Sequence, residues 1–235
     1  QRLNIQFPDR ITRVTEYVPE IIVFIEKLIT NGYAYSSNGS VYFNIDAYTS
    51  NGHTYAKLDP SKIGSKEIEQ ETDGVLGIEN KSDKHNQNDF ALWKKSKENE
   101  PSWESPWGNG RPGWHIECSA ISKKILGQPF DIHTGGVDHI GTHHTNEIAQ
   151  SEGALYGKGR KEDDAPFVNY WMHNGHIRVN EEKMSKSLGN FFLIRDVLKS
   201  FDPEVLRFFM LKAHYRSPIN YSDAQLEEAR SGLAR

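Results

Sequence analysis

The chain has 235 residues, of which 36% are hydrophobic and 26% charged, and a formal net charge of −4. That length suffices for one large domain or two small ones with a real hydrophobic core, and the charge gives no global argument for binding nucleic acid, so any contact with RNA must depend on local patches. No apolar run approaches the length of a membrane span, and no N-terminal stretch is typical of a signal peptide. Cys118 is the only cysteine, which excludes a disulfide within the chain. We therefore expect a cytoplasmic protein that makes no contact with a membrane.

The first predicted element is a helix. Apolar residues between 14 and 29 recur at helical spacing, and Gly32 follows them as a C-terminal glycine should. Residues 33–35 and 41–44 then flank Asn38-Gly39, a pair typical of a type I′ turn. The sequence thus predicts a helix followed by a β-hairpin.

The middle of the chain is less regular. Residues 46–88 are polar and without clear periodicity, so we expect loops and short irregular elements of an inserted module. Four tryptophans then lie between residues 93 and 114, among prolines and glycines. A helical pattern runs from Trp114 to Ile125 and ends at Gly127.

Two strand-like runs follow, at residues 129–133 and 167–173, and each is followed at once by glycine. The segment 143–157 between them has the pattern of a helix. Strand, helix, strand is the crossover typical of a parallel α/β sheet, whose ligands bind at the carboxyl ends of the strands. We expect a pocket there, near the residues that follow or end these runs: His133, Asp138, His173 and Asn174.

Two more helices are predicted near the C-terminus. Asp202-Pro203 is typical of an N-cap followed by proline in the first turn, and Ser222 with Gln225 forms a capping box. The sequence begins at Gln1 without a methionine and stops at Arg235 inside the last predicted helix. From these ends we expect a fragment.

Three residues form a candidate metal site. Cys118 lies in the first turns of one predicted helix, and His143 and Glu147 lie four residues apart on one face of another. Thiolate, imidazole and carboxylate are all zinc ligands, and three protein ligands with an open position are typical of a catalytic site. His144 is a rival to His143, but helix geometry points it about 100° away from the face of Glu147. Taken alone, these residues have a simpler explanation: Cys118 is a buried cysteine that packs as a small hydrophobe, and His143 with Glu147 is a surface pair.

Residues 181–190, EEKMSKSLGN, form a candidate phosphate-binding loop. Lys183 and Lys186 supply charge, Ser185 and Ser187 supply hydroxyl donors, and Met184 lies between them. Such groups suit a polyanion whose charge changes during a reaction. A solvated Lys/Ser loop is the simpler alternative for an isolated match.

Several motifs together resemble one family. The loop at 181–190 resembles the KMSKS signature of class I aminoacyl-tRNA synthetases, and residues 110–120, GRPGWHIECSA, resemble the zinc-cysteine segment of cysteinyl-tRNA synthetases. Residues 131–138 (DIHTGGVD), 143–151 (HHTNEIAQS) and 169–175 (NYWMHNG) are similar to further blocks of that family, in the same order.

The resemblance implies roles for named positions. It places zinc ligands at Cys118, His143 and Glu147, and an ATP-contacting lysine at Lys186 with Lys183 as its partner. It implies contacts with the amino acid or with the adenosine of ATP for the following residues: Trp114, His133, His173, Gly136 and Asp138. For Trp114, packing in the core remains an equal alternative.

The implied fold is α/β: the second half of a class I synthetase Rossmann-like parallel sheet, with a connective insertion module and the start of a helical region. We expect the connective module at 1–90, the half-sheet with the zinc site at 91–178, and the signature loop with the start of the helical region at 179–235. The family's fourth zinc ligand, an N-terminal cysteine, and its His-x-Gly-His element have no counterpart here, since residues 139–142 match the latter by letter only. We expect both of these, and the anticodon-binding region, to lie outside the chain.

The implied function is ligation of L-cysteine to tRNA(Cys) with ATP and Mg²⁺, with zinc selecting the thiol, by a protein that is monomeric at full length. The fragment alone should be inactive. A ligase that joins cysteine to an amino sugar through the same adenylate, and a non-catalytic zinc- or RNA-binding module, remain alternatives. A zinc hydrolase is disfavoured because no His-Glu-x-x-His helix accompanies the ligands.

Overall fold

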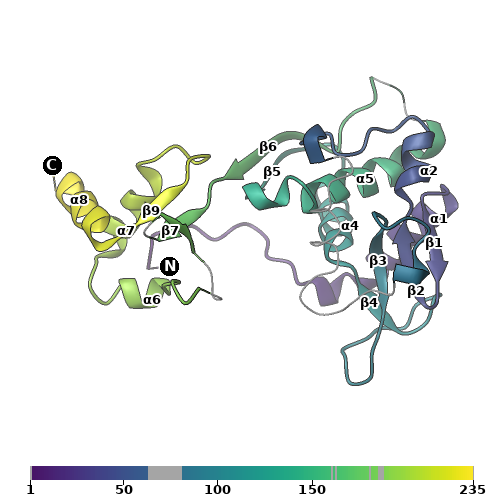
Figure 1. Cartoon of the computed structure of the whole chain (residues 1–235), viewed down its shortest axis with the longest axis horizontal. Helices are drawn as coiled ribbons and strands as arrows, with labels where there is room; N and C mark the ends of the chain where they lie inside the picture. The colour runs from purple at the N-terminus through teal and green to yellow at the C-terminus, as the bar shows by residue number, and fades with distance from the viewer. Residues whose placement is uncertain are drawn as a thin grey trace. The chain divides into compact units, whose positions relative to one another are not determined.

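The computed structural model describes residues 2–62, 81–159, 161, 163–179, 181–184 and 188–234. The chain forms two compact units (Figure 1). The larger unit comprises Thr12–His133 and Asp138–Trp171, and the smaller unit comprises Gln1–Ile11, Thr134–Val137 and Met172–Arg235.

The larger unit begins with a 3-10 turn, Val14–Glu16, and helix α1, Val18–Thr30. The prediction of one continuous helix from residue 14 is wrong at Tyr17, whose φ of −120° and ψ of 13° separate the two pieces. The apolar face of α1 is buried, and Gly32 follows the helix with a φ of +83°. That positive φ favours glycine, and for this reason the C-terminal end of α1 could be predicted from the sequence.

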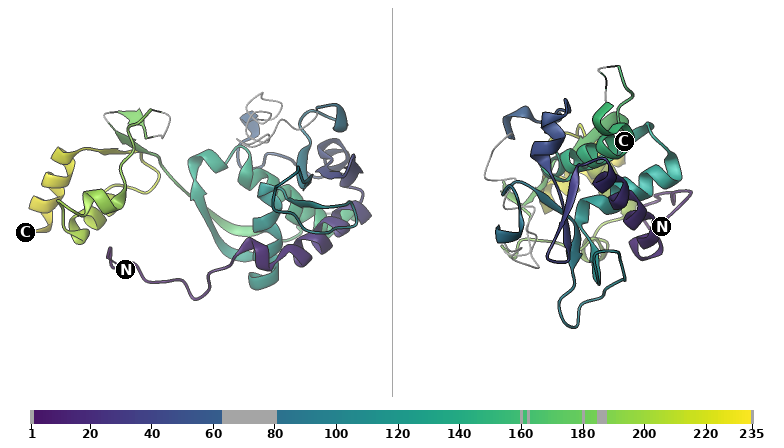
Figure 2. Two further views of the ribbon diagram at one scale, coloured as in Figure 1. Left: turned by 90° about the horizontal axis from the view of Figure 1, so that it is seen from below. Right: turned by 90° about the vertical axis from the view of Figure 1, so that its right-hand side faces the viewer.

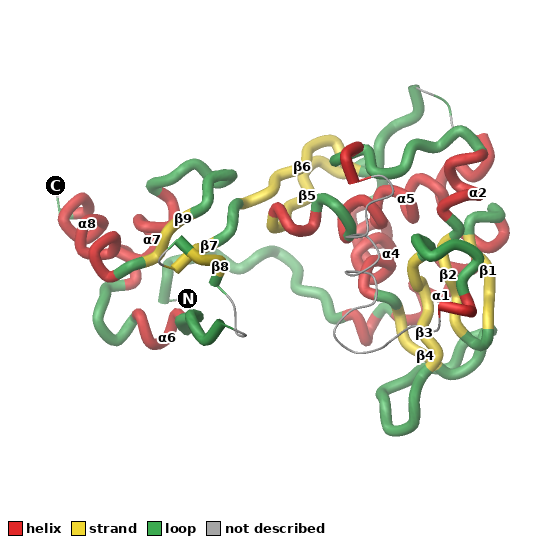
Figure 3. Tube along the Cα trace, viewed as in Figure 1, coloured by secondary structure: helices red, strands yellow, loops and turns green. Residues whose placement is uncertain are grey.

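The predicted hairpin is confirmed as β1, Ala34–Ser37, and β2, Ser40–Phe43. Both turn residues have positive φ, 51° at Asn38 and 85° at Gly39, as a type I′ turn requires. The sheet continues through two strands that we did not predict, β3 (Phe90–Lys95) and β4 (Gly110–Pro112), in the antiparallel order β1-β2-β3-β4 (Figure 3).

Strand β3 was missed because its first four residues are all buried, so the sequence has no alternation of polar and apolar positions. The expected domain boundary between residues 90 and 91 falls inside this strand. Within 46–88, the described part contains helix α2, Ile45–Ser50, capped by the side chain of Asn44, and two 3-10 turns, Pro60–Lys62 and Lys81–Asp83. Residues 63–80 lie outside the described residues.

Helices α4, Trp114–Leu126, and α5, His143–Tyr156, match the predicted segments to within one residue at each end. They pack against each other, and α1 packs against both; Figure 2 shows these helices from two further sides. Helix α5 is buried along nearly its whole length, although most of its residues are polar. Polar side chains buried in this way are costly unless they are bonded or bind something, so α5 is where a functional site is expected.

Strands β5, Phe130–Gly136, and β6, Val168–Asn174, are hydrogen-bonded neighbours, and the division between the two units passes through both. The predicted end of the first strand is wrong, because β5 continues three residues beyond His133. His133 therefore lies in the middle of the strand and not at its carboxyl end. His173 and Asn174 do end β6, and Asp138 lies in the 3-10 turn after β5, Val137–His139.

The smaller unit contains a three-stranded sheet of β7 (Ile177–Val179), β8 (Glu182–Lys183) and β9 (Ile219–Tyr221), in which β7 pairs in parallel with β9. The expected boundary between residues 178 and 179 falls inside β7. Helices α6 (Ile194–Val197), α7 (Pro203–Leu211) and α8 (Asp223–Leu233) complete this unit. Both predicted caps are confirmed: the Asp202 side chain accepts from the backbone N–H of Glu204, and Ser222 accepts from that of Gln225.

Candidate metal centre

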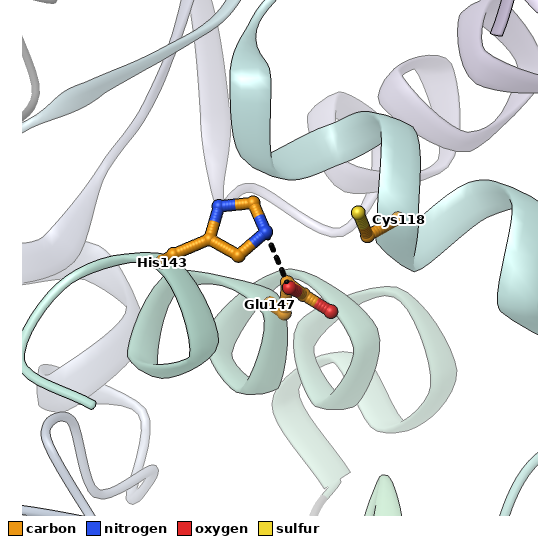
Figure 4. Close-up of side chains that lie close together, drawn as sticks. All are labelled: Cys118, His143 and Glu147. Atoms are coloured by element: carbon orange, nitrogen blue, oxygen red, sulfur yellow. Dashed lines mark ion pairs between the residues drawn. The ribbon is translucent and has the colours of Figure 1, made fainter. Parts of the chain in front are cut away.

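Three candidate ligands meet between α4 and α5. The Cys118 sulfur, a His143 ring nitrogen and a Glu147 carboxylate oxygen all lie within 4.8 Å of one another. Cys118 comes from the second turn of α4, while His143 and Glu147 are one turn apart on α5, with His143 Nε2 2.8 Å from Glu147 Oε1. Figure 4 shows the three side chains close together, with the ring of His143 directed toward the carboxylate of Glu147.

A polar contact helps to hold the two helices in register. Ser119, next to Cys118, is completely buried, and its hydroxyl donates to Oε1 of Gln150 at 2.7 Å. Ser119 directly follows Cys118, and Gln150 lies three residues after Glu147. This bond therefore fixes the position of α4 along the axis of α5. The thiol of Cys118 is thereby placed beside the carboxylate.

Burial disfavours the charged form of all three candidate ligands when no cation is present. It raises the pKa of Glu147 to about 7, lowers that of His143 to about 4, and raises that of Cys118 to about 12, the last with a contribution from nearby Glu147 and Glu117. A divalent cation would reverse this balance, because it favours the thiolate and the carboxylate.

The residues present fit a zinc ion. Glu147 is 0% exposed, yet neither of its carboxylate oxygens accepts a hydrogen bond from the described residues. A buried carboxylate without hydrogen bonds is costly, and a cation shared with sulfur and imidazole would offset that cost. One sulfur, one nitrogen and one oxygen are a donor set that zinc accepts.

Glu147 also belongs to a second cluster. Ligand atoms of His133, His144 and Glu147 lie within 4.8 Å of one another, and His133 Nε2 is 3.4 Å from Glu147 Oε2. Helix geometry favoured His143 over His144, but the structure brings a ring nitrogen of each histidine within 4.8 Å of a carboxylate oxygen of Glu147. Sequence reasoning missed this pairing because it depends on β5 delivering His133 to α5.

The pocket residues predicted in the larger unit lie beside these clusters. Trp114 is 50% exposed, and its ring centroid is 4.4 Å from that of His143. That exposure argues against the alternative that Trp114 packs in the core. The His133 ring is 4.9 Å from Trp171, a neighbour that the sequence did not single out.

A buried histidine was also missed. His115 follows Trp114 in α4, is 3% exposed, and has its Nδ1 2.9 Å from Nδ1 of His143. Burial lowers its pKa well below the ordinary value, and nearby His143 lowers it further. The signal was present in the sequence, since His115 lies three residues before Cys118 and so neighbours it on the surface of the same helix.

The remaining predicted residues belong to the smaller unit, except Asp138, which lies in the turn after β5. Gly136 ends β5, and His173 is buried near the end of β6. Met184 follows β8 and packs against the apolar cluster of this unit. Lys183 lies in β8, opposite Arg178, whereas Ser185, Lys186 and Ser187 lie outside the described residues.

Comparison with known proteins agrees with the resemblance. A family model described as tRNA synthetases class I (C) catalytic domain matches residues 1–231. The chain therefore belongs to the class I tRNA synthetase (C) catalytic-domain family, as its motifs predicted. None of the described helices is long and apolar enough to cross a membrane.

Curated relatives include a cysteine–tRNA ligase of Polynucleobacter necessarius subsp. necessarius, 61% identical over 99% of this chain and 48% of the relative. Another is a cysteine–tRNA ligase of Syntrophotalea carbinolica, 53% identical over 100% of this chain and 45% of the relative. The chain thus spans about half the length of the curated relatives it matches.

Two solved structures share the fold. One is Mycobacterium tuberculosis methionyl-tRNA synthetase in complex with methionyl-adenylate, with a TM-score of 0.61 and 18% identity over 100% of this chain and 53% of that one. The other is a putative arginyl-tRNA synthetase from Campylobacter jejuni, with a TM-score of 0.52 and 14% identity over 96% of this chain and 38% of that one. These likenesses confirm the predicted α/β class I synthetase fold.

Proposed function

We propose that the chain is the zinc-binding and pyrophosphate-binding part of a cysteine–tRNA ligase, which joins L-cysteine to tRNA(Cys) at the expense of ATP. The observation that carries the proposal is the convergence of Cys118, His143 and Glu147 around a buried carboxylate that accepts no hydrogen bond from the described residues. The names of the curated relatives support the same activity.

Selection of the amino acid belongs to the metal centre in this proposal. Zinc, when bound, supplies a borderline-soft Lewis acid that binds a thiolate far better than a hydroxyl. The chain's part is to hold the ion with Cys118, His143 and Glu147; beside these and the fourth ligand expected outside the chain, one coordination position is left for the substrate thiolate. Serine would leave that position without its ligand, and sites of this kind discriminate by roughly 10⁴-fold, which makes a separate editing domain unnecessary.

Within the larger unit, contacts with the amino acid are assigned to Trp114 and His133, and the assignment of His173, in the smaller unit, rests on the resemblance alone. The half-exposed indole of Trp114 beside His143 gives the substrate an apolar wall next to the metal ligands. His133, whose Nε2 lies 3.4 Å from Oε2 of Glu147, supplies a polar group at the other oxygen of that carboxylate.

The chemistry has two steps. The carboxylate oxygen of cysteine attacks the α-phosphorus of Mg²⁺-bound ATP, which forms cysteinyl-adenylate and releases pyrophosphate. A hydroxyl at the 3′ end of the tRNA then attacks the carbonyl carbon and displaces AMP. In the first step Lys183 and Lys186 offset the charge of the departing pyrophosphate, and Ser185 and Ser187 donate hydrogen bonds to it. Met184, within the same loop, packs against the apolar cluster of the smaller unit.

Gly136 and Asp138, which end and follow β5, are assigned to the adenosine. Backbone at the carboxyl ends of strands is where nucleotides bind in α/β sheets. We further propose that the complete protein is a cytoplasmic monomer, and that this chain alone supports negligible adenylate formation, because it spans only about half of its relatives.

Two measurements test the proposal. The purified chain should contain about one zinc ion, as a single three-ligand site predicts, and a Cys118→Ser variant should contain much less. Cysteine-dependent exchange of pyrophosphate into ATP should be absent for the chain alone and appear when the N-terminal region of a curated relative is added. Vigorous exchange by the chain alone would contradict the account.

A second experiment separates the two ligases. After exchange activity is established, AMP release should be stimulated by tRNA(Cys) and not by an amino sugar. Stimulation by the sugar alone would identify the alternative cysteine ligase. A chain that binds zinc but supports no pyrophosphate exchange, either alone or with the N-terminal region of a relative added, would favour a non-catalytic module.

A further inference from the structure

His115 makes a contact that none of the proposed roles explains. It lies in the first turn of α4, is 3% exposed, and has its Nδ1 2.9 Å from Nδ1 of His143 on α5. Phe90 of β3, which is fully buried, also contacts His115, with the two rings edge to face and their centroids 5.7 Å apart. The four-stranded sheet thus holds His115 against the metal centre.

The contact determines which nitrogen of His143 carries its hydrogen. A neutral imidazole has one N–H, so a hydrogen bond between the two Nδ1 atoms requires one ring to donate and the other to accept. If His143 donates, its Nε2 is a bare lone pair. If His115 donates, the hydrogen of His143 lies on Nε2, the atom that is 2.8 Å from Glu147 Oε1.

The geometry around Glu147 distinguishes the two arrangements. Despite the short separation, Oε1 of Glu147 accepts no hydrogen bond from the part of the chain that the structure describes, so an N–H on Nε2 of His143 would be directed away from the carboxylate. Among the described residues that N–H would have no hydrogen-bond acceptor, whereas an N–H on Nδ1 has one in His115, so the second arrangement loses a hydrogen bond. With the hydrogen on Nδ1, the N–H of His143 is bonded to His115 and the lone pair of Nε2 faces the cluster.

We propose that His115 is a positioning residue that accepts the Nδ1–H of His143 and so presents the Nε2 lone pair of His143 to a zinc ion shared with Cys118 and Glu147. This inference rests on the zinc site of the proposed function. Hydrogen bonds of this kind set the tautomer and the ring orientation of a ligand, and their loss lowers metal affinity by about 10- to 100-fold.

The test uses three variants of the chain. His115→Leu removes the acceptor while keeping similar bulk. His115→Asn places an amide oxygen close to the position of Nδ1, where it can still accept. Ile116→Val is the matched control, because Ile116 is the next residue of α4, is 0% exposed, and packs into the apolar core.

Zinc affinity is measured by competition with a chromophoric chelator, and thermal unfolding of the metal-free chains reports stability. We expect His115→Leu to bind zinc about 10- to 100-fold more weakly, and His115→Asn to recover most of the loss. Ile116→Val should keep wild-type affinity although it loses some stability. Equal affinity of the Leu variant and the wild type would overturn the proposal.

A spectroscopic measurement keeps the test decisive if the Leu variant does not fold. Nitrogen-15 NMR of the imidazoles should show the hydrogen of His143 on Nδ1 in the wild-type chain with and without zinc. A hydrogen on Nε2 in both states would overturn the positioning role. A wild-type chain that binds no zinc at all would instead remove the metal part of the proposed function, and the metal-free spectrum would still report the tautomer.

Discussion

His133 and His143 contact opposite oxygens of one carboxylate: His133 Nε2 lies 3.4 Å from Oε2 of Glu147, and His143 Nε2 lies 2.8 Å from Oε1. One histidine comes from strand β5 and the other from helix α5, so Glu147 joins the predicted amino-acid pocket to the predicted metal ligands. A change at this carboxylate should therefore disturb both.

Glu147→Gln should abolish tight zinc binding with little change of shape. The amide cannot supply the negative charge that helps to hold a dication, so we expect a larger loss of affinity than the roughly 10- to 100-fold that follows removal of an outer hydrogen-bond partner. Chelator competition measures it. The control is Glu152→Gln on the same helix, where a buried carboxylate 2.5 Å from Lys57 is changed outside the cluster; that variant should lose stability and keep its zinc affinity.

Zinc affinity should rise with pH. Burial raises the pKa of Cys118 to about 12 and that of Glu147 to about 7, so at neutral pH the thiol must lose a proton on binding, and so must part of the carboxylate population. Above pH 7 the thiol alone dominates, and the dissociation constant should fall by about tenfold per pH unit. Calorimetric titrations of the chain with zinc, in buffers with different ionisation enthalpies, measure the number of protons released on binding. Affinity independent of pH between 7 and 9 would contradict a thiolate ligand.

Gly113→Ala should destabilise the larger unit. Gly113 is the N-cap of α4, and an added Cβ would lie 2.1 Å from the backbone oxygen of Ala91 in β3, which no side-chain movement relieves. Overpacking typically costs ~1–3 kcal/mol, and a clash with the backbone should fall at the upper end. Urea unfolding measures the loss. Gly159→Ala, where the added Cβ meets no described atom within 4 Å, should cost far less.

Lys186→Ala should slow adenylate formation much more than it weakens cysteine binding. Lys186 lies outside the described residues, so the prediction rests on its position in the sequence of the signature loop. Loss of one positioned donor to developing charge typically costs about 10²- to 10³-fold in rate. The readouts are pyrophosphate exchange, with the N-terminal region of a relative supplied, and calorimetric cysteine binding. Lys199→Ala, an exposed lysine paired with Asp196, is the matched control, and equal damage to rate and binding by Lys186→Ala would refute the role.

Much of the local structure was determined by the sequence itself. The ends of α4 and α5, the turn at Asn38-Gly39 and the caps at Asp202 and Ser222 were all predictable, because each depends on spacing or backbone preference within a few residues. The family was recognisable for the same reason, since its motifs are short and ordered along the chain.

Only the tertiary structure decided how distant segments meet. Strands β3 and β4 join the hairpin through long-range pairing that leaves no alternating pattern in their sequence. Cys118 and Glu147 come together because α4 packs on α5, and His115 reaches His143 across the same interface. Helical periodicity fixes the face on which a side chain lies, but the distance across two helices is set by packing, which no local pattern encodes.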